Sequence, residues 1–336
     1  MVTQAQIAKK LGVSRQLVTF ALSGYPQISK ESRERILAAA REMGYTPNPY
    51  ARALKKSRSG IIGLWIPDQI STHYTHVARE LNRLVKTARY ELIVSEVSIA
   101  EEQQMLSHVP MDGIFVVDAP EQAEIYLKSL TASKVPIISM GAECCKNTDA
   151  VHVDLFAGVL EVMEHLINSG FRRIAHATFF REDSQHLGRR AGYLKAISEA
   201  KLKPEFIYYP LTEQQRPIAR QLIQDYIHVN GCPDAIFCHS DDVALGIYRG
   251  LCDLKMRVPQ DVSLVGCDGI QDTEYLECQL TTLVQPVTAM CATAWQFLLR
   301  RMDQATTKPQ IAKLKPKLVI RDSSVRERRP VALPQP

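Results

Sequence analysis

Arg189, Asp241 and Asp268 are residues of the right types to hold a small polar molecule. Each follows an apolar run or begins a helical pattern, and in open α/β sheets ligands bind beyond the carboxyl ends of the strands. A guanidinium donates hydrogen bonds as a fork and a carboxylate accepts them, so an Arg and an Asp together can hold adjacent hydroxyl groups. That chemistry favours a sugar, although each residue taken alone could equally form a surface ion pair.

A metal site is the other chemistry that this part of the chain suggests. His73 and His76 lie three residues apart in a helical pattern, which could place both on one metal ion. No third or fourth ligand stands nearby in the sequence, so surface or ligand-facing histidines are the favoured interpretation. The eight cysteines include no C-x-x-C pair and are expected to be reduced, small apolar residues. We therefore expect no metal and no cofactor.

Enzyme motifs are missing from the sequence. There is no G-x-G-x-x-G after the first apolar run, no G-x-x-x-x-G-K-[ST] and no G-x-S-x-G. Without a phosphate-binding loop, or a nucleophile with its base, the sequence disfavours a sugar kinase or a hydrolase. We expect the protein not to be an enzyme.

The first sixty residues are much more basic than the rest. They carry eleven Lys/Arg and three Glu, which leaves 30 basic and 33 acidic residues of the chain's 41 and 36 for the remainder. A basic head on a mildly acidic body predicts a polyanionic partner for the head alone.

Helix signals divide this head into short helices. Thr3 and Gln6 form a capping box, Gly12 ends the first helix, and Ser14 caps a second helix. Two short helices joined by a tight turn are typical of a helix-turn-helix, whose second helix enters the major groove of DNA. Its early outward residues, which would meet base edges, are Arg15, Gln16, Thr19 and Phe20. A three-helix scaffold that binds protein is the alternative.

A third helix and a linker complete the head. Ser29 opens the third helix and Gly44 ends it. In the linker, residues 46–58, Asn48 suits an N-cap and Pro49 suits the first helical position. The helix so defined has only about two turns and is too short to be stable alone, so we expect it to fold when something binds it.

Beyond residue 59, short apolar runs alternate with helical patterns, which predicts an α/β fold with parallel sheets. The expected strands are 61–66, 92–95, 113–117, 136–140, 174–177, 235–238, 263–267 and 281–284. The expected helices are 73–88, 100–108, 121–132, 155–168, 187–200, 213–227, 241–254 and 286–303. The length suits two such lobes, and the Arg- and Pro-rich tail, 323–336, is expected to be loose.

The head resembles that of the LacI/GalR family of bacterial transcriptional regulators. The resemblance rests on VTQAQIAKKLGVSRQLVTFALSG and on ISKESRERILAAAREMGYTPNPYARALKK, in the spacing typical of the family. It implies that the linker becomes a hinge helix in the minor groove, where Leu54 wedges into the central base step of a palindromic operator and bends it. Leu17 and Phe20 depart from the usual family residues, which predicts an unusual outer half-site.

The body resembles the same family in PDAIFCHSDDVALG, RVPQDVSLVGCDGI and LTTLVQP. The resemblance implies a body like a periplasmic sugar-binding protein, with two lobes that close on an effector and three chain crossings between them. It also implies a homodimer, because two heads must meet a two-fold operator, and the tail lacks the leucine heptad of tetrameric members. Ser240 replaces the usual Asn, and Phe179 or Phe180 could face the ligand or pack between the lobes.

These expectations define a domain plan. It consists of a helix-turn-helix domain (1–45), a hinge (46–58), an effector-binding and dimerisation body (59–322) and the tail. The N-lobe would comprise 60–153 and 287–315, and the C-lobe 154–286 and 316–322. The residues expected at DNA are Thr3, Ser14, Arg15, Gln16, Leu17, Thr19, Phe20, Ser29, Asn48, Ala51, Arg52, Leu54 and Lys55. Those expected at the effector are His73, Tyr74, Arg189, Asp241 and Asp268.

The predicted function is a transcriptional regulator, most simply a repressor, that binds double-stranded DNA and a small-molecule effector. The alternative is a stand-alone sugar-binding protein of the periplasmic type. The basic head opposes it, as does an N-terminus, MVTQAQIAKKLGV, without the apolar core of a signal peptide. No stretch approaches the roughly 20 apolar residues of a membrane span, so a cytoplasmic protein is expected.

Overall fold

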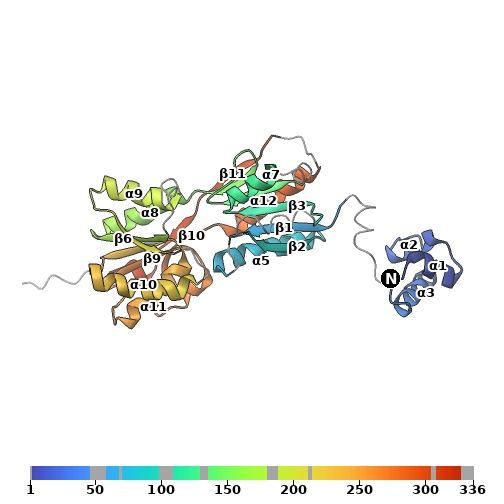
Figure 1. The fold of residues 1–336 in the computed structure, drawn as a ribbon, viewed down its shortest axis with the longest axis horizontal. Helices are drawn as coiled ribbons and strands as arrows, with labels where there is room; N and C mark the ends of the chain where they lie inside the picture. The colour runs from blue at the N-terminus through green and yellow to red at the C-terminus, as the bar shows by residue number, and fades with distance from the viewer. Residues whose placement is uncertain are drawn as a thin grey trace, which may run out of the picture. The chain divides into compact units, whose positions relative to one another are not determined.

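The computed structural model describes residues 2–45, 58–67, 70–97, 109–128, 135–179, 188–210, 214–303 and 308–326. The chain divides into two compact units, Met1–Ser59 and Gly60–Pro336, which we call the head and the body (Figure 1). The hinge residues Asn48, Ala51, Arg52, Leu54 and Lys55 and the predicted helix 100–108 lie outside the described residues.

The head consists of α1 (Gln4–Leu11), α2 (Arg15–Leu22) and α3 (Lys30–Glu42). Thr3 and Gln6 form the predicted capping box, and the hydroxyls of Ser14 and Ser29 each accept a backbone N–H in the first turn of α2 and α3. Gly12 ends α1 at φ 66°, a conformation that favours glycine. The fully buried Ile7, Val18 and Ile36, one from each helix, form the centre of the core.

The first lobe of the body, the N-lobe, contains a parallel sheet in the order β11-β5-β4-β3-β1-β2. Its strands are β1 (Ile61–Ile66), β2 (Glu91–Glu96), β3 (Gly113–Val117), β4 (Ile137–Gly141), β5 (Asp149–Val153) and β11 (Ile311–Leu314). Helices α5 (Thr72–Thr87) and α12 (Val287–Asp303) contact each other against this sheet, and α7 (Pro120–Lys128) packs on β3 and β4. The central strands β1, β3 and β4 are almost entirely apolar because both faces of the sheet are covered there.

The second lobe, the C-lobe, contains a sheet in the order β12-β10-β9-β8-β6-β7, in which only β12 is antiparallel to its neighbour. Its strands are β6 (Ile174–Phe179), β7 (Glu205–Tyr209), β8 (Ala235–Cys238), β9 (Ser263–Asp268), β10 (Thr281–Val284) and β12 (Lys317–Val319). Figure 1 shows the helix pairs on its two sides, α8 (Leu155–Asn168) with α9 (Gly188–Glu199) and α10 (Gln215–Asn230) with α11 (Asp241–Asp253).

The chain crosses between the lobes three times, from β5 to α8, from β10 to α12 and from β11 to β12. The predicted fold class, a helical head on a two-lobed body with parallel sheets, is therefore confirmed. The strand assignment from sequence was incomplete, because β5, β7, β11 and β12 were not among the expected strands. Of these, β11 and β12 are short and rich in lysine and lie at sheet edges, so they lack a continuous apolar run.

The prediction that the tail is loose from residue 323 onward was wrong for its first residues. Ser323 and Ser324 are fully buried, in a 3₁₀ turn at Asp322–Ser324. The Ser323 hydroxyl accepts from the Thr281 amide and donates to the Leu264 carbonyl, which fixes this turn against β9 and β10. Residues 327–336 lie outside the described residues. Among the helices that are described, none is long and apolar enough to cross a membrane.

The buried histidine of β6 makes the stability of the body depend on pH. His176 is fully buried, stacks on Phe237, and shares a hydrogen bond between its Nδ1 and the Phe237 carbonyl. Burial lowers the pKa of His176 to about 4. The folded protein therefore keeps this ring neutral below pH 6.5, where the unfolded chain binds a proton.

We expect the low pKa of His176 to reduce the free energy of unfolding by about 2 kcal/mol between pH 7 and pH 5, since one pKa unit corresponds to about 1.4 kcal/mol. Urea unfolding at the two pH values should show a smaller loss in His176→Gln, whose amide can still donate to Phe237. His228→Gln, at an exposed position on α10, is the matched control. Equal losses in the His176 variant and the wild type would contradict the assignment.

Candidate functional site

The start of α2 is exposed on the surface of the head. Arg15 and Gln16, at the start of this helix, are exposed, as predicted for residues that meet base edges. Thr19 is instead engaged within the head, because its hydroxyl donates to the Gln4 side chain at 2.8 Å and so ties α2 to α1. Phe20 stacks on Tyr25 with ring centroids 4.8 Å apart.

The remaining predicted DNA contacts in the described head have structural roles as well. Leu17 is half-buried against the head core. The exposed hydroxyls of Thr3, Ser14 and Ser29 satisfy first-turn amides. Helix N-termini with exposed caps of this kind are suited to phosphate oxygens, since their N–H groups and dipole attract anions. Arg15 and Gln16 are therefore the residues of the described head best placed to read bases.

In the body, the structure brings together Arg189, at the start of α9, and Asp268, at the end of β9. Arg189 Nη2 lies 3.2 Å from Asp268 Oδ1, and its Nε donates to the Cys267 sulfur at 3.4 Å. The Gln285 amide donates to the same carboxylate oxygen at 2.8 Å. Asp268 has φ 127°, a strained backbone for a residue with a side chain, as is frequent at ligand-binding positions.

Burial opposes the charged form of both members of this pair. It raises the pKa of Asp268 to about 6, although Arg189 and Gln285 act in the opposite direction. Burial alone would lower the pKa of Arg189, but Cys267 and the carboxylates of Asp268 and Asp118 outweigh it and hold the pKa above its ordinary value. The guanidinium therefore stays charged, and the carboxylate can accept hydrogen bonds at neutral pH.

The N-lobe contributes His73 and Tyr74, both in the first turn of α5. His73 is 4% exposed, and its Nε2 is buried without a hydrogen-bond partner among the described residues. Burial lowers the pKa of His73 to about 4, so the ring is neutral near pH 7 and can either donate or accept. Burial and then Asp118 raise the pKa of Tyr74 well above 10, which keeps its hydroxyl protonated.

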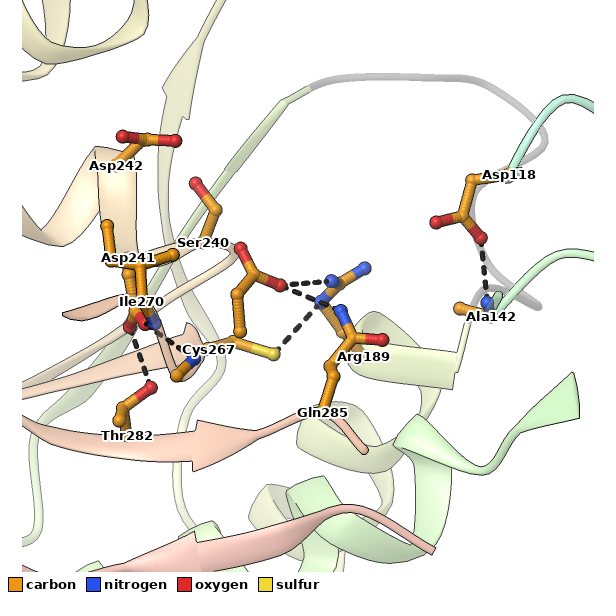
Figure 2. A network of polar contacts seen from close by, with 12 residues as sticks. Asp118, Ala142, Arg189, Ser240, Asp241, Asp242, Cys267, Ile270, Thr282 and Gln285 are labelled. Atoms are coloured by element: carbon orange, nitrogen blue, oxygen red, sulfur yellow. Dashed lines mark hydrogen bonds and ion pairs between the residues drawn. The ribbon is translucent and has the colours of Figure 1, made fainter. Parts of the chain in front are cut away.

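Asp118 is a site residue that the sequence analysis did not select. It directly follows β3, and its Oδ1 accepts from the amides of Ala142 at 2.7 Å and Glu143 at 3.0 Å (Figure 2). The Tyr74 hydroxyl lies 3.5 Å from its Oδ2. A Cβ at Gly141, where φ is 108°, would come within 2.3 Å of this carboxylate, so glycine is required there. The rule that selected Asp268, a polar residue after a buried strand, would also have found Asp118.

A narrow cavity between the lobes is lined by residues of both, including Ala142, Glu143, Phe179, Arg189 and His239. An adjoining cavity of about 240 Å³ extends along the first crossing at 153–156. Phe179 is thus a lining residue, whereas Phe180 lies outside the described residues. In the described part of the chain, no group of three or more His, Cys, Asp or Glu could hold a metal ion.

Comparison with known proteins places both parts of the chain. Residues 4–48 match bacterial regulatory proteins of the lacI family, and residues 163–324 match the periplasmic binding protein-like domain. Catabolite control protein A of Priestia megaterium is 25% identical over 330 residues, 96% of this chain and 99% of that protein. The HTH-type transcriptional repressor PurR of Escherichia coli O1:K1 is 27% identical over 96% of this chain and 97% of its own length. The chain belongs to the LacI family.

Solved structures agree with this LacI-family fold. A lac repressor dimer bound to operator and the anti-inducer ONPF covers 97% of this chain and 99% of its own, with a TM-score of 0.80 and 22% identity. The regulator CelR in complex with cellobiose covers 96% and 100%, with a TM-score of 0.67 and 23% identity. A LacI-family regulator from Enterococcus faecium with bound ribose covers 78% and 98%, with a TM-score of 0.71 and 21% identity.

For Asp241, the prediction of an effector contact was wrong for this LacI-family chain. The side chain is fully buried, and both carboxylate oxygens are occupied from within the C-lobe (Figure 2). Oδ2 accepts from the amides of Gly269 at 2.7 Å and Ile270 at 2.9 Å, and Oδ1 accepts from the Thr282 hydroxyl at 2.7 Å. Asp241 thus fixes the backbone that follows Asp268 and supports the cleft without facing it.

We expect Asp241→Ala to destabilise the body by about 3 kcal/mol or more, because three buried donors lose their acceptor. Urea or thermal unfolding measures this directly. Asp253→Ala, at the other end of α11, removes a carboxylate paired with Arg220 and Arg249 near the surface and should cost about 1 kcal/mol or less. If Asp241→Ala kept wild-type stability but lost ligand binding, the original prediction that Asp241 contacts the effector would be supported.

Proposed function

We propose that this LacI-family protein is a transcriptional repressor whose head reads an operator and whose two-lobed body binds a sugar that controls it. The observation that carries the effector part is the buried Arg189–Asp268 pair, which opposes His73, Tyr74 and Asp118 of the other lobe. The described groups offer donors, acceptors and both charges. A polyhydroxylated molecule can use all of them, because each hydroxyl both donates and accepts.

The names of the relatives support this assignment. PurR is a transcriptional repressor, and the lac repressor structure contains an operator. The structures with cellobiose and ribose contain sugars on the same fold. The proposal assigns no catalytic step to the chain and places it in the cytoplasm, where its DNA is.

DNA binding in this proposal has two parts. Arg15 is suited to guanine O6 and N7, and Gln16 to adenine N6 and N7, in the major groove. Residues 46–58 form the proposed hinge, in which Leu54 inserts into the minor groove and bends a palindromic operator. A homodimer fits this arrangement, since two identical heads match two half-sites.

Control of DNA binding follows from differential contacts. A sugar that contacts both lobes stabilises the arrangement in which those contacts coexist, and it shifts the protein toward that state. In a dimer, a change between the lobes would alter the spacing of the two hinges, and a helix as short as the hinge would fold or melt in response.

Arg15→Ala should weaken binding to the best operator by about 1–3 kcal/mol and relax one base position in each half-site. Selection from random DNA with the full chain, followed by titration at several salt concentrations, measures both effects. Arg41→Ala, on α3, is the control for loss of positive charge. Affinity should fall steeply with salt in every variant. The same selected motif from the Arg15 variant and the wild type would refute the assignment of Arg15.

A panel of neutral sugars that includes ribose, lactose and cellobiose tests the effector site by thermal shift. A sugar at 100 times its Kd stabilises the folded protein by about 2.7 kcal/mol. Arg189→Ala and Asp268→Asn should each abolish most of this shift, and their effects should be non-additive because both groups hold one ligand. Wild-type shifts in either variant would place the ligand elsewhere, and operator binding without sugar should persist in both.

A further inference from the structure

The first turn of α5, which carries His73 and Tyr74, is not capped by its own lobe. The N-cap residue Ser71 makes no side-chain capping hydrogen bond. The Thr72 amide, one of the helix's first N–H groups, instead donates to Asp242 Oδ2 at 3.0 Å. Asp242 lies in the first turn of α11, in the C-lobe, so the carboxylate that caps this helix comes from across the cleft.

The same carboxylate is held on its other side by Arg216 of α10. Its Oδ1 accepts from Arg216 Nε at 2.8 Å and from the Thr72 hydroxyl at 3.0 Å. Arg216 Nη2 donates to the Thr72 oxygen at 3.0 Å and to Asp272 at 2.9 Å. Asp242 is only 5% exposed. The four residues Thr72, Arg216, Asp242 and Asp272 form a closed polar network that joins the lobes.

Asp241 and Asp242, the first two residues of α11, therefore have different roles. Figure 2 shows Asp242 directed away from the buried carboxylate of Asp241. Among the described residues, Asp241 accepts from its own lobe, from the backbone after β9 and from β10, whereas Asp242 reaches the N-lobe. The sequence alone gives two adjacent acids, and only the structure distinguishes them.

We propose that Asp242 is a positioning residue that caps α5 from the opposite lobe and thereby orders His73 and Tyr74 only when the lobes are together. An N-cap acceptor stabilises a helix start, and a carboxylate there gains further from the helix dipole. When the lobes separate, the Thr72 N–H and hydroxyl lose this acceptor, and the turn that carries His73 and Tyr74 loosens. The effect of this cap on effector binding rests on the proposed function, whereas the existence of the cap does not.

Amide hydrogen exchange of the full-length protein without any sugar tests the cap. Exchange in a peptide covering the first turn of α5, residues 72–75, should be about tenfold faster in Asp242→Ala than in the wild type. Thr72→Val removes the hydroxyl and keeps the amide, so a smaller increase of about threefold is expected. Asp253→Ala, on the same helix and also ion-paired, is the matched control and should leave this peptide unchanged.

Each outcome decides the proposal. Wild-type exchange of residues 72–75 in both Asp242→Ala and Thr72→Val would overturn it. An equal increase in Asp253→Ala would also overturn it, because general loosening of α11 would then be the cause. If Asp242→Ala does not fold, Thr72→Val decides alone, since that change lies in the N-lobe.

A second measurement connects the cap to ligand binding. For any sugar of the panel that stabilises the wild type, Asp242→Ala should raise its Kd about tenfold, and Asp253→Ala should not change it. If no panel sugar binds the wild type while the exchange result holds, the proposed sugar effector fails and the cap stands. An unchanged Kd in Asp242→Ala would refute the effect of the cap on the ligand-facing residues.

Discussion

A buried guanidinium and carboxylate are stable together only while their other polar partners stay in place. Arg189 and Asp268 meet this condition through Gln285 and Cys267. Gln285 lies directly in the second crossing between the lobes, so the pair is attached to one of the segments that connect them. Asp241 then fixes the backbone beyond Asp268. The geometry of the candidate binding site is thus linked to the second crossing through one ion pair and its partners.

The two walls of the cleft are electrically different. The C-lobe supplies the cationic guanidinium of Arg189, paired with Asp268, whereas the N-lobe supplies the Asp118 carboxylate beside His73 and Tyr74, which burial keeps neutral. Neutral donors and acceptors adapt to either direction of a hydrogen bond, and a fixed guanidinium does not. This division suits a ligand that is oriented by one lobe and then enclosed by the other.

The sequence predicted the head and the α/β alternation, because these depend on local periodicity and capping. It did not predict β11 and β12, since IAKLKPKLV, residues 311–319, has no continuous apolar run. These residues form strands by pairing with β5 and β10. It also misplaced Asp241, which has the type and position of a ligand contact. Only the fold shows that the amides of Gly269 and Ile270 already occupy it. Asp118 was accessible to the same strand-end rule and was overlooked.

The last described residues of the chain also affect how the protein can be made. Neither lobe is a continuous stretch of sequence, since the N-lobe takes α12 and β11 from the far end and the C-lobe takes β12 and the turn at Asp322–Ser324. During synthesis, a ribosome must therefore release about 320 residues before either sheet has all its strands, whereas the local contacts of the head are complete from the start. Until then, β5 and β10 lack their partners β11 and β12. The nascent body is most prone to aggregation during this interval, because these strand edges are unpaired.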